Sequence, residues 1–192
     1  MKLTRSKPNS REKILAAAVA VAREAGPGSL SLEAIAVRAG VSKGGLLYNF
    51  PTKAKLMQGL VERYLSEFEQ ALEDARANET AGESLLSTYI RLAARECEET
   101  KPSPSWIFSA IAEDPDFLKP IKAFRRQLFE RLKAQTPDKK ALLVSYLAIE
   151  GLRSMNLFDS DVLTQEERQT LVSALMDIAD TPAGRRDTDQ SG

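Results

Sequence analysis

The chain has 192 residues, and its apolar content of 43% and charged content of 28% are ordinary for a soluble globular protein. No apolar run approaches the roughly 20 residues that a membrane span needs, and the basic N-terminus carries no signal-peptide pattern. The chain has no histidine, which excludes a Cys/His metal cluster and a Ser-His-Asp triad. The single cysteine, Cys97, is typical of a reducing cytoplasm.

The formal net charge of zero conceals an uneven distribution. Residues 1–55 hold ten basic and three acidic side chains and carry a net charge of +7, so the remaining 137 residues carry −7. A basic first quarter attracts a polyanion, while the acidic remainder repels it. The alternative is a basic tail without a partner. The positive charges continue into periodic sequence, which favours a polyanion-binding domain.

Every periodic segment has helical character, because Ala, Leu, Glu, Lys and Arg dominate and apolar residues recur three or four positions apart. The sequence therefore predicts an all-α protein of about nine helices without strands. The first helix is expected after a flexible basic tail, residues 1–9, with Asn9 or Ser10 as its cap. The Gly-Pro-Gly run at 26–28 should end it, and residues 182–192 are expected to form a disordered tail.

The next two helices are short and separated by a tight turn. Ser31 is the expected N-cap of the second helix, and Gly40 its left-handed C-terminal residue. Ser42 is expected to cap a third helix that runs to about Phe50, where a proline stops it. This spacing predicts a helix-turn-helix domain over residues 10–52, whose third helix is short enough to lie in a DNA major groove.

Six more helices are expected in a larger C-terminal domain over residues 53–181. The longest of them begins directly after the helix-turn-helix domain, and a short one is expected at residues 105–114. Thr136, followed by a proline, is predicted to cap the eighth helix. Thr164 with Glu167 three residues later predicts a capping box at the start of the ninth.

The third helix carries the side chains that suit DNA. Gly44 and Gly45 would let its first turn approach bases or phosphates closely; the alternative, which is compatible with this role, is that they only permit a tight turn. Lys43 can reach guanine or a phosphate, and the Tyr48 hydroxyl can donate to a phosphate oxygen. Lys53 adds charge at a helix N-terminus that already suits an anion.

The stretches "ILAAAVAVAREAG", "SLEAIAVRAGVSKGGLLYNF" and "PTKAKLM" follow one another over residues 10–57 in an order and spacing that resembles the DNA-binding region of TetR-type (TetR/AcrR) transcriptional regulators. The resemblance implies a homodimeric, all-helical regulator with an N-terminal DNA-binding domain and a larger C-terminal domain that senses ligand and dimerises. It places operator contacts in the third helix and a phosphate-contacting lysine just after it. The predicted DNA-binding residues are Arg38, Ser42, Lys43, Gly44, Gly45, Leu47, Tyr48, Asn49 and Lys53.

Two of these positions depart from the family pattern. Leu47 stands where the family often has tyrosine, and Asn49 where it often has histidine. Phosphate anchoring would then rest more on Tyr48, and Leu47 would make an apolar contact such as one to a thymine methyl. The alternatives are that Tyr48 packs in the core and that Arg38 is only a surface charge.

The C-terminal domain has a candidate ligand site and a candidate dimer interface. The resemblance implies a cavity within this domain, and the residues expected near it are Tyr89, Arg95, Trp106, Phe108 and Met155. Ordinary core packing is the alternative for the aromatic residues, and a surface salt bridge is the alternative for Arg95. The last two helices are apolar around much of their circumference, which favours a four-helix interface between two subunits over burial within one. The predicted interface residues are Leu147, Gly151, Leu171 and Leu175.

The resulting hypothesis is a cytoplasmic, ligand-responsive transcriptional repressor that binds a near-palindromic operator as a homodimer and is released by a small molecule. No cofactor or metal is expected. The alternatives are a transcriptional activator and a constitutive helical DNA-binding protein without an effector. An all-helical enzyme using Glu96, Glu113 or Glu150 is ranked last, because no two of these carboxylates stand at a catalytic or metal-binding spacing.

Overall fold

The computed structural model describes residues 9–25, 31–78, 83–99, 114–158, 160 and 162–181. Within these ranges the chain forms eight α-helices and one 3-10 helix and no strand, so the predicted all-α class is confirmed. Only the last residue of the helix predicted at 105–114 is described, and the rest lies outside, as do residues 1–8 of the first predicted tail and the whole of the second. The chain divides into unit 1, Met1–Leu65 with Pro104–Pro120, and unit 2, Ser66–Ser103 with Ile121–Gly192. No helix in the described ranges is long and apolar enough to cross a membrane.

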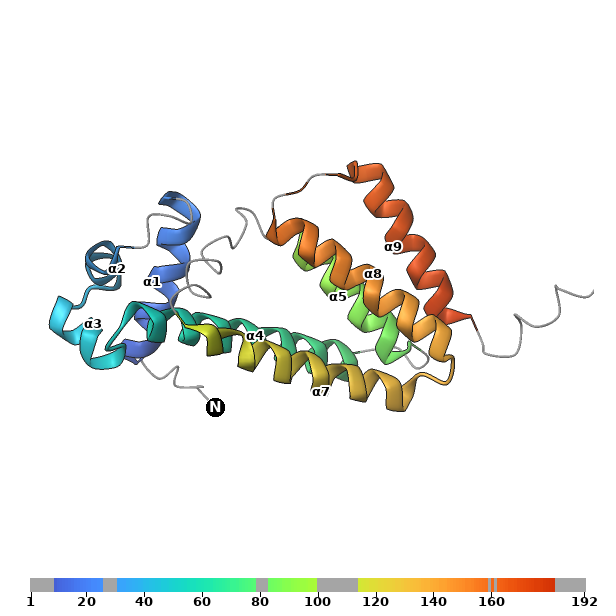
Figure 1. Cartoon of the computed structure of the whole chain (residues 1–192), viewed down its shortest axis with the longest axis horizontal. Helices are drawn as coiled ribbons and strands as arrows, with labels where there is room; N and C mark the ends of the chain where they lie inside the picture. The colour runs from blue at the N-terminus through green and yellow to red at the C-terminus, as the bar shows by residue number, and fades with distance from the viewer. Residues whose placement is uncertain are drawn as a thin grey trace, which may run out of the picture. The chain divides into compact units, whose positions relative to one another are not determined.

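Unit 1 begins with α1 (Ser10–Ala25), α2 (Leu32–Ala39) and α3 (Lys43–Asn49), which pack on one another (Figure 1). The cap of α1 is Asn9 and not Ser10. The Asn9 Oδ1 atom accepts the Glu12 N–H at 2.9 Å, and the Glu12 carboxylate accepts the Asn9 N–H at 3.3 Å, which satisfies two donors of the first turn reciprocally. The core of these helices consists of Ile14, Leu15, Ala17, Ala18, Val21, Ile35, Ala36 and Leu46.

The turn between α2 and α3 has the predicted residues in the predicted roles. The Ser31 Oγ atom accepts the Ala34 N–H at the start of α2. Gly40 ends that helix with a left-handed φ of 66°. The Gly40 N–H donates to Val37 and the Val41 N–H to Ala36, the pattern that closes a helix through a left-handed glycine.

The long helix α4 (Lys53–Ala77) contributes residues to both units. Thr52 caps it by accepting the Lys55 N–H at 3.1 Å. In unit 1, α4 passes close to α1 at Gly59. A Cβ atom on Gly59 would lie 2.8 Å from Cε1 of the buried Phe50 ring and 3.2 Å from Cδ2 of Leu15. Only glycine at this position allows so close an approach.

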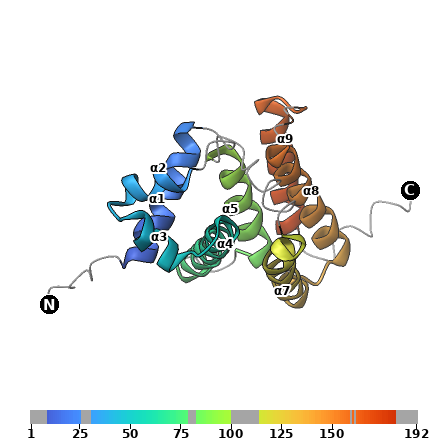
Figure 2. The same ribbon diagram turned by 60° about the vertical axis from the view of Figure 1, so that its left-hand side comes forward.

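Unit 2 is built from the end of α4 with α5 (Leu85–Glu99), α7 (Lys119–Gln135), α8 (Lys139–Leu157) and α9 (Gln165–Asp180). A 3-10 helix, η2 (Pro115–Leu118), precedes α7 and belongs to unit 1. The helices α5, α8 and α9 pack on one another (Figures 1 and 2). Their shared core is aliphatic and aromatic and includes Leu86, Tyr89, Ile90, Leu142, Ile149 and Leu175.

The two predicted caps in unit 2 had different outcomes. The capping box of α9 is confirmed, since the Thr164 side chain accepts the Glu167 N–H while the Glu167 carboxylate accepts the Thr164 N–H. The prediction that Thr136 caps α8 is wrong. Asp138 is the cap, and its Oδ1 atom accepts the N–H groups of Lys140 and Ala141. Asp138 stands directly before the first residue of α8, the position from which a capping side chain accepts the first N–H groups of the helix.

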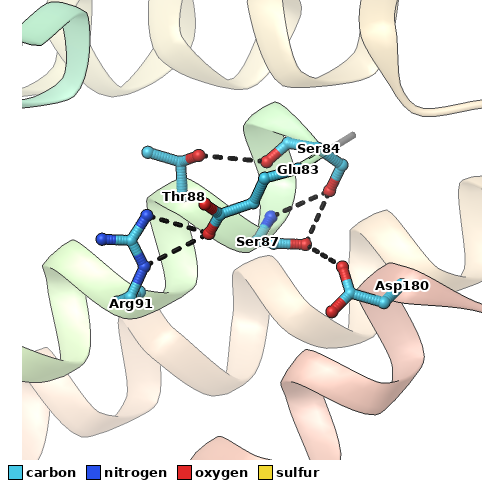
Figure 3. A network of polar contacts seen from close by, with 6 residues as sticks. All are labelled: Glu83, Ser84, Ser87, Thr88, Arg91 and Asp180. Atoms are coloured by element: carbon cyan, nitrogen blue, oxygen red, sulfur yellow. Dashed lines mark hydrogen bonds and ion pairs between the residues drawn. The ribbon is translucent and has the colours of Figure 1, made fainter. Parts of the chain in front are cut away.

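A polar network joins the start of α5 to the end of α9 (Figure 3). Ser84 caps α5 by accepting the Ser87 N–H at 3.0 Å, and the Ser87 hydroxyl donates to Asp180 Oδ1 at 2.6 Å. Ser87 is fully buried, so this bond satisfies a hydroxyl that would otherwise destabilise the core. Asp180 is the last residue of α9, and its bond to Ser87 fixes where that helix ends on α5.

Candidate functional site

The short helix α3 has a buried side and an exposed side. Leu46 is fully buried and Phe50, at its C-terminal cap, is 2% exposed, so these residues hold the helix on unit 1. Tyr48 is 88% exposed, and Lys43 and Gly44 are also exposed. The alternative that Tyr48 packs in the core is therefore wrong. A large aromatic side chain held in solvent on a seven-residue helix is available for a partner.

The two glycines of α3 differ in how much room the fold leaves for a side chain. Neither has a positive φ, since Gly40 alone does among the described glycines, so a strained turn does not account for them. A Cβ atom on Gly45 would lie 3.3 Å from the Ser42 hydroxyl, which caps α3 by accepting the Gly45 N–H at 3.0 Å. A Cβ atom on Gly44 would meet nothing nearer than 3.9 Å. The fold does not require Gly44, although glycine costs about 1 kcal/mol in a helix.

Lys43 is held by an acid on the neighbouring helix. Its Nζ atom donates to Glu33 Oε1 at 2.5 Å, and the Ser31 hydroxyl donates to the other carboxylate oxygen at 3.1 Å. The hydrogen bond from Lys43, together with those from the Glu33 N–H and Ser31, lowers the pKa of Glu33 to about 2. Both side chains are about 60% exposed, so water and other anions have access to the pair.

Arg38 has the same kind of partner. Its guanidinium donates through both terminal nitrogens to the Glu24 carboxylate, at 2.5 and 2.7 Å. This fork lowers the pKa of Glu24, chiefly through the hydrogen bond from Arg38. A phosphate contact by Arg38 would have to replace a two-bond contact with Glu24. Arg38 therefore lies in a surface ion pair, which agrees with the alternative that it is a surface charge.

The remaining residues of the predicted DNA-binding set lie on or next to α3. Leu47 is half-buried, and the Asn49 amide donates to the Gly45 carbonyl oxygen at 2.8 Å, which ties that side chain to its own helix. Lys53 is half-buried at the first position of α4. All nine predicted residues thus fall within one stretch of unit 1, from the end of α2 to the start of α4.

The three described residues of the predicted ligand-binding set differ in burial. Tyr89 is fully buried on α5, whereas Arg95 on the same helix is exposed. Met155 is half-buried on α8. Trp106 and Phe108 lie outside the described residues.

A charged cluster in unit 2 was missed by the sequence analysis. The Arg153 guanidinium donates to Glu96 Oε2 at 2.9 Å and to Glu150 Oε1 at 3.1 Å. Its central carbon lies 4.7 Å from the centre of the Phe68 ring and 5.7 Å from that of Tyr89. These five residues, from α4, α5 and α8, are called the Arg153 box. Glu96 and Glu150, which the sequence analysis considered only as acid–base groups of an enzyme, are brought together here by one arginine.

The Arg153 box has further polar and aromatic neighbours. Glu150 also pairs with Arg125 at 3.1 Å, and the Tyr89 hydroxyl donates to Glu150 Oε1 at 3.3 Å. The Tyr146 ring is stacked on that of Tyr89, with centroids 5.8 Å apart. Burial of Tyr89 raises the pKa of its hydroxyl well above the usual value, so it remains a hydrogen-bond donor at physiological pH.

The predicted dimer residues divide between surface and core. Leu147 is 66% exposed, and Leu143 and Val144 one turn earlier on α8 are about half exposed. A Cβ atom on Gly151 would meet nothing within 4 Å. Leu171 of α9 is half-buried against the core of unit 2, and Leu175 is 2% exposed there. Because the Leu175 side chain packs in the core of unit 2, its burial gives the interface role no support, and that role stays a prediction.

Two family models match the chain. The model described as "Bacterial regulatory proteins, tetR family" matches residues 14–60, and the model described as "Tetracyclin repressor-like, C-terminal domain" matches residues 83–180. Among curated protein sequences, none matches.

Several solved structures are similar to the chain over most of its length. The multidrug binding protein EbrR, complexed with imidazole, is 21% identical with a TM-score of 0.64, over 93% of this chain and 99% of that one. A transcriptional regulator from Aquifex aeolicus VF5 is 22% identical with a TM-score of 0.56, over 88% and 96%. The fatty acid degradation regulator FadR from Bacillus halodurans is 18% identical with a TM-score of 0.59, over 95% and 99%. At these identities the likeness shows a shared fold.

Proposed function

This chain belongs to the tetR family of bacterial regulatory proteins, and on that basis we propose that it is a cytoplasmic repressor that binds a near-palindromic operator as a homodimer and releases it when a small molecule binds. Membership of the family makes the chain a DNA-binding transcription regulator and not an enzyme. Residues 10–52 would form the DNA-binding domain, and residues 53–181 the domain that senses the effector and dimerises.

The exposed side of α3 carries the proposal for DNA binding. Leu46 and Phe50 fix the helix on unit 1, while Tyr48 stands 88% exposed on its other side. Gly44 leaves the backbone of the first turn uncovered, at a position where the fold would accept a side chain. In helix-turn-helix proteins the first turn of the second helix of the motif meets base edges, and hydroxyl groups such as that of Tyr48 bind phosphate oxygens.

The ion pair of Lys43 supports the same use of this surface. The Glu33 carboxylate holds the Lys43 ammonium in an exposed position, where a DNA phosphate would compete as an equivalent anionic partner. Phosphate contacts of this kind release counterions, so binding should weaken steeply as salt is added.

The dimer and the effector are proposed for unit 2. The exposed apolar side chains Leu143, Val144 and Leu147 on α8 would meet their copies across a two-fold axis, and the two copies of α3 would then read half-sites related by the same axis. A small-molecule effector is supported by the fold shared with EbrR, a multidrug binding protein solved with imidazole and with ethidium. Such an effector would release DNA by binding more tightly to the form that does not fit the operator.

The proposal is tested by selecting bound sequences from random duplex DNA with the full chain. The wild-type protein should enrich an inverted repeat. The double variant Tyr48→Phe, Lys53→Ala should bind that repeat roughly 10- to 100-fold more weakly, because two phosphate contacts at about 1 kcal/mol or more each are removed. The matched control is Tyr64→Phe, Lys55→Ala, which makes the same two changes on α4 and should keep wild-type affinity.

Two results would contradict the proposal. Binding with a steep salt dependence but without an enriched sequence would mean a non-specific DNA-binding protein. Equal losses in the double variant and its control would mean that total charge, and not the surface around α3, determines binding. A reporter gene placed behind the selected repeat then separates repression from activation.

A further inference from the structure

The Arg153 box places charge beside the apolar core of unit 2. The side chains of Arg153, Glu150 and Glu96 are 13%, 15% and 21% exposed, and Phe68 and Tyr89 beside them are buried. Burying an ion pair costs desolvation that its mutual attraction barely repays, and apolar residues of the same volume often stabilise a core as well or better. Packing alone therefore does not account for this cluster.

The residues around Arg153 have the chemistry of a site for a flat cation. A guanidinium is a planar, delocalised and weakly hydrated cation. Here it lies over the Phe68 ring and near the Tyr89 ring, while its edge donates to two carboxylates. Aromatic faces and carboxylates together are the groups that bind planar organic cations in proteins.

We propose that Arg153 is the resident occupant of a cation site, and that the effector is a planar organic cation that displaces its guanidinium from Glu96, Glu150 and the rings of Phe68 and Tyr89. This inference rests on the proposed function, since it names the chemical class of the proposed effector. A cation that takes the place of Arg153 also replaces the group packed against the Phe68 ring. Phe68 lies on α4, and the first residue of the same helix is Lys53.

Charge balance favours a cation over an anion. Glu96 and Glu150 face Arg153, and Arg125 pairs with the second oxygen of Glu150. An incoming cation exchanges for Arg153 one for one, so both carboxylates keep a positive partner. An incoming anion would have to draw Arg153 away from carboxylates that already occupy both of its terminal nitrogens. That exchange would take a positive partner from two largely shielded carboxylates at once, which is unfavourable.

The test uses three probes of one shape and different charge: benzamidinium, benzamide and benzoate. Binding to the purified full-length protein is measured by calorimetry in the absence of DNA. Benzamidinium should bind at least about tenfold more tightly than the other two, the factor that a cation–π contact with a charge-assisted hydrogen bond supplies. The variant Arg153→Ala, which vacates the site, should bind benzamidinium roughly tenfold more tightly than the wild-type protein.

Three further variants make the test specific. Glu150→Gln should weaken benzamidinium binding about tenfold, because it removes one carboxylate from the site. Arg91→Ala is the matched control, since it removes an arginine of α5 from an exposed pair with Glu83 and should leave all three affinities unchanged. If Arg153→Ala does not fold, Arg153→Lys replaces it, because a compact ammonium binds aromatic faces less well and should also yield to benzamidinium.

The results that would overturn the inference are distinct from those that would overturn the proposed function. Benzoate binding that is lost in Arg153→Ala would make Arg153 an anion receptor. No benzamidinium binding to any of the folded proteins would mean that the box is purely structural. Either result leaves sequence-specific DNA binding intact. Benzamidinium binding with the expected dependence on Arg153 supports the cation site even if the random-duplex selection enriches no operator.

Discussion

Units 1 and 2 each hold cations against carboxylates, in opposite surroundings. In unit 1, Lys43 and Glu33 are both about 60% exposed, whereas in unit 2 Arg153 is 13% exposed between Glu96 and Glu150. Water screens the first pair, so either partner can exchange for another ion at little cost. The second group is shielded from water and tolerates only an exchange that conserves charge. On this comparison, the exposed pair in unit 1 can be opened by a polyanion such as DNA, and the shielded group in unit 2 by a small ion of the same charge as Arg153.

The largest expected difference between the two kinds of ion pair is the loss of stability on replacing Arg153. Arg153→Met leaves two carboxylates in a poorly hydrated site and should lower the free energy of unfolding by about 3–5 kcal/mol. Urea denaturation measures this change. Arg38→Met, which removes an arginine from the exposed pair with Glu24, is the control and should have a much smaller effect. Equal losses in the two variants would show that the Arg153 box is as open to water as the surface pairs.

The reactivity of the single cysteine measures how well the core of unit 2 is protected from water. Cys97 is 8% exposed, and burial raises the pKa of its thiol to about 11 from the usual 9.0, against a smaller opposing influence of Arg153. At pH 8 this shift reduces the thiolate fraction roughly 100-fold. Alkylation of the native protein should be slower than that of the urea-unfolded chain by at least this factor. Equal labelling rates in the two states would mean that the core of unit 2 opens freely.

Two helix glycines should respond to alanine with opposite signs. Gly59→Ala places a Cβ atom 2.8 Å from the buried Phe50 ring in unit 1 and should destabilise the protein by about 1–3 kcal/mol. Gly151→Ala in unit 2 meets nothing within 4 Å and should stabilise the subunit by up to about 1 kcal/mol. Thermal unfolding measures both changes. If Gly151→Ala also weakens self-association in ultracentrifugation, then α8 approaches its copy closely at this position.

The smallest effect is expected at the exposed pair. In Lys43→Met the main hydrogen bond to Glu33 is lost, so the pKa of Glu33 should rise from about 2 toward its usual 4.5. Because the folded state lowers this pKa, the pair stabilises the protein above pH 4.5, and that contribution is lost as the pH falls from 4.5 to 2. Carboxyl chemical shifts measured from pH 2 to 7 test this prediction. An unchanged Glu33 titration would mean that Ser31 and the backbone, and not Lys43, hold the carboxylate.

The sequence predicted the features of the fold that depend on neighbouring residues. Ser31, Gly40 and Ser42 mark the ends of α2 and α3 through side-chain and backbone chemistry that acts within a few positions. The capping box of Thr164 and Glu167 is equally local. Thr136 failed as a cap because another good capping residue, Asp138, stands two positions later, and spacing alone does not choose between them.

The features that the sequence did not predict depend on residues far apart in the chain. Gly59 carries no local signal in the sequence, because its neighbours Phe50 and Leu15 come close only after folding. Arg153 and Glu96 are 57 positions apart, so no spacing rule connects them. One local signal was present: Glu150 and Arg153 stand three residues apart in the mainly apolar second half of α8, which indicates a charged pair facing inward.

The bond between Ser87 and Asp180 has a consequence for how the protein is made. It joins positions 93 residues apart, and α9, which packs on α5, is synthesised after α5, α7 and α8. The helices α1, α2 and α3 contact one another within the first fifty residues, so they can fold while the ribosome is still translating the rest. Unit 2 cannot assemble until α9 has left the exit tunnel. A nascent chain would therefore carry a folded α1–α3 region before it has a complete core in unit 2. A stop codon shortly before position 180 would remove Asp180 and leave the buried Ser87 hydroxyl of α5 without this bond.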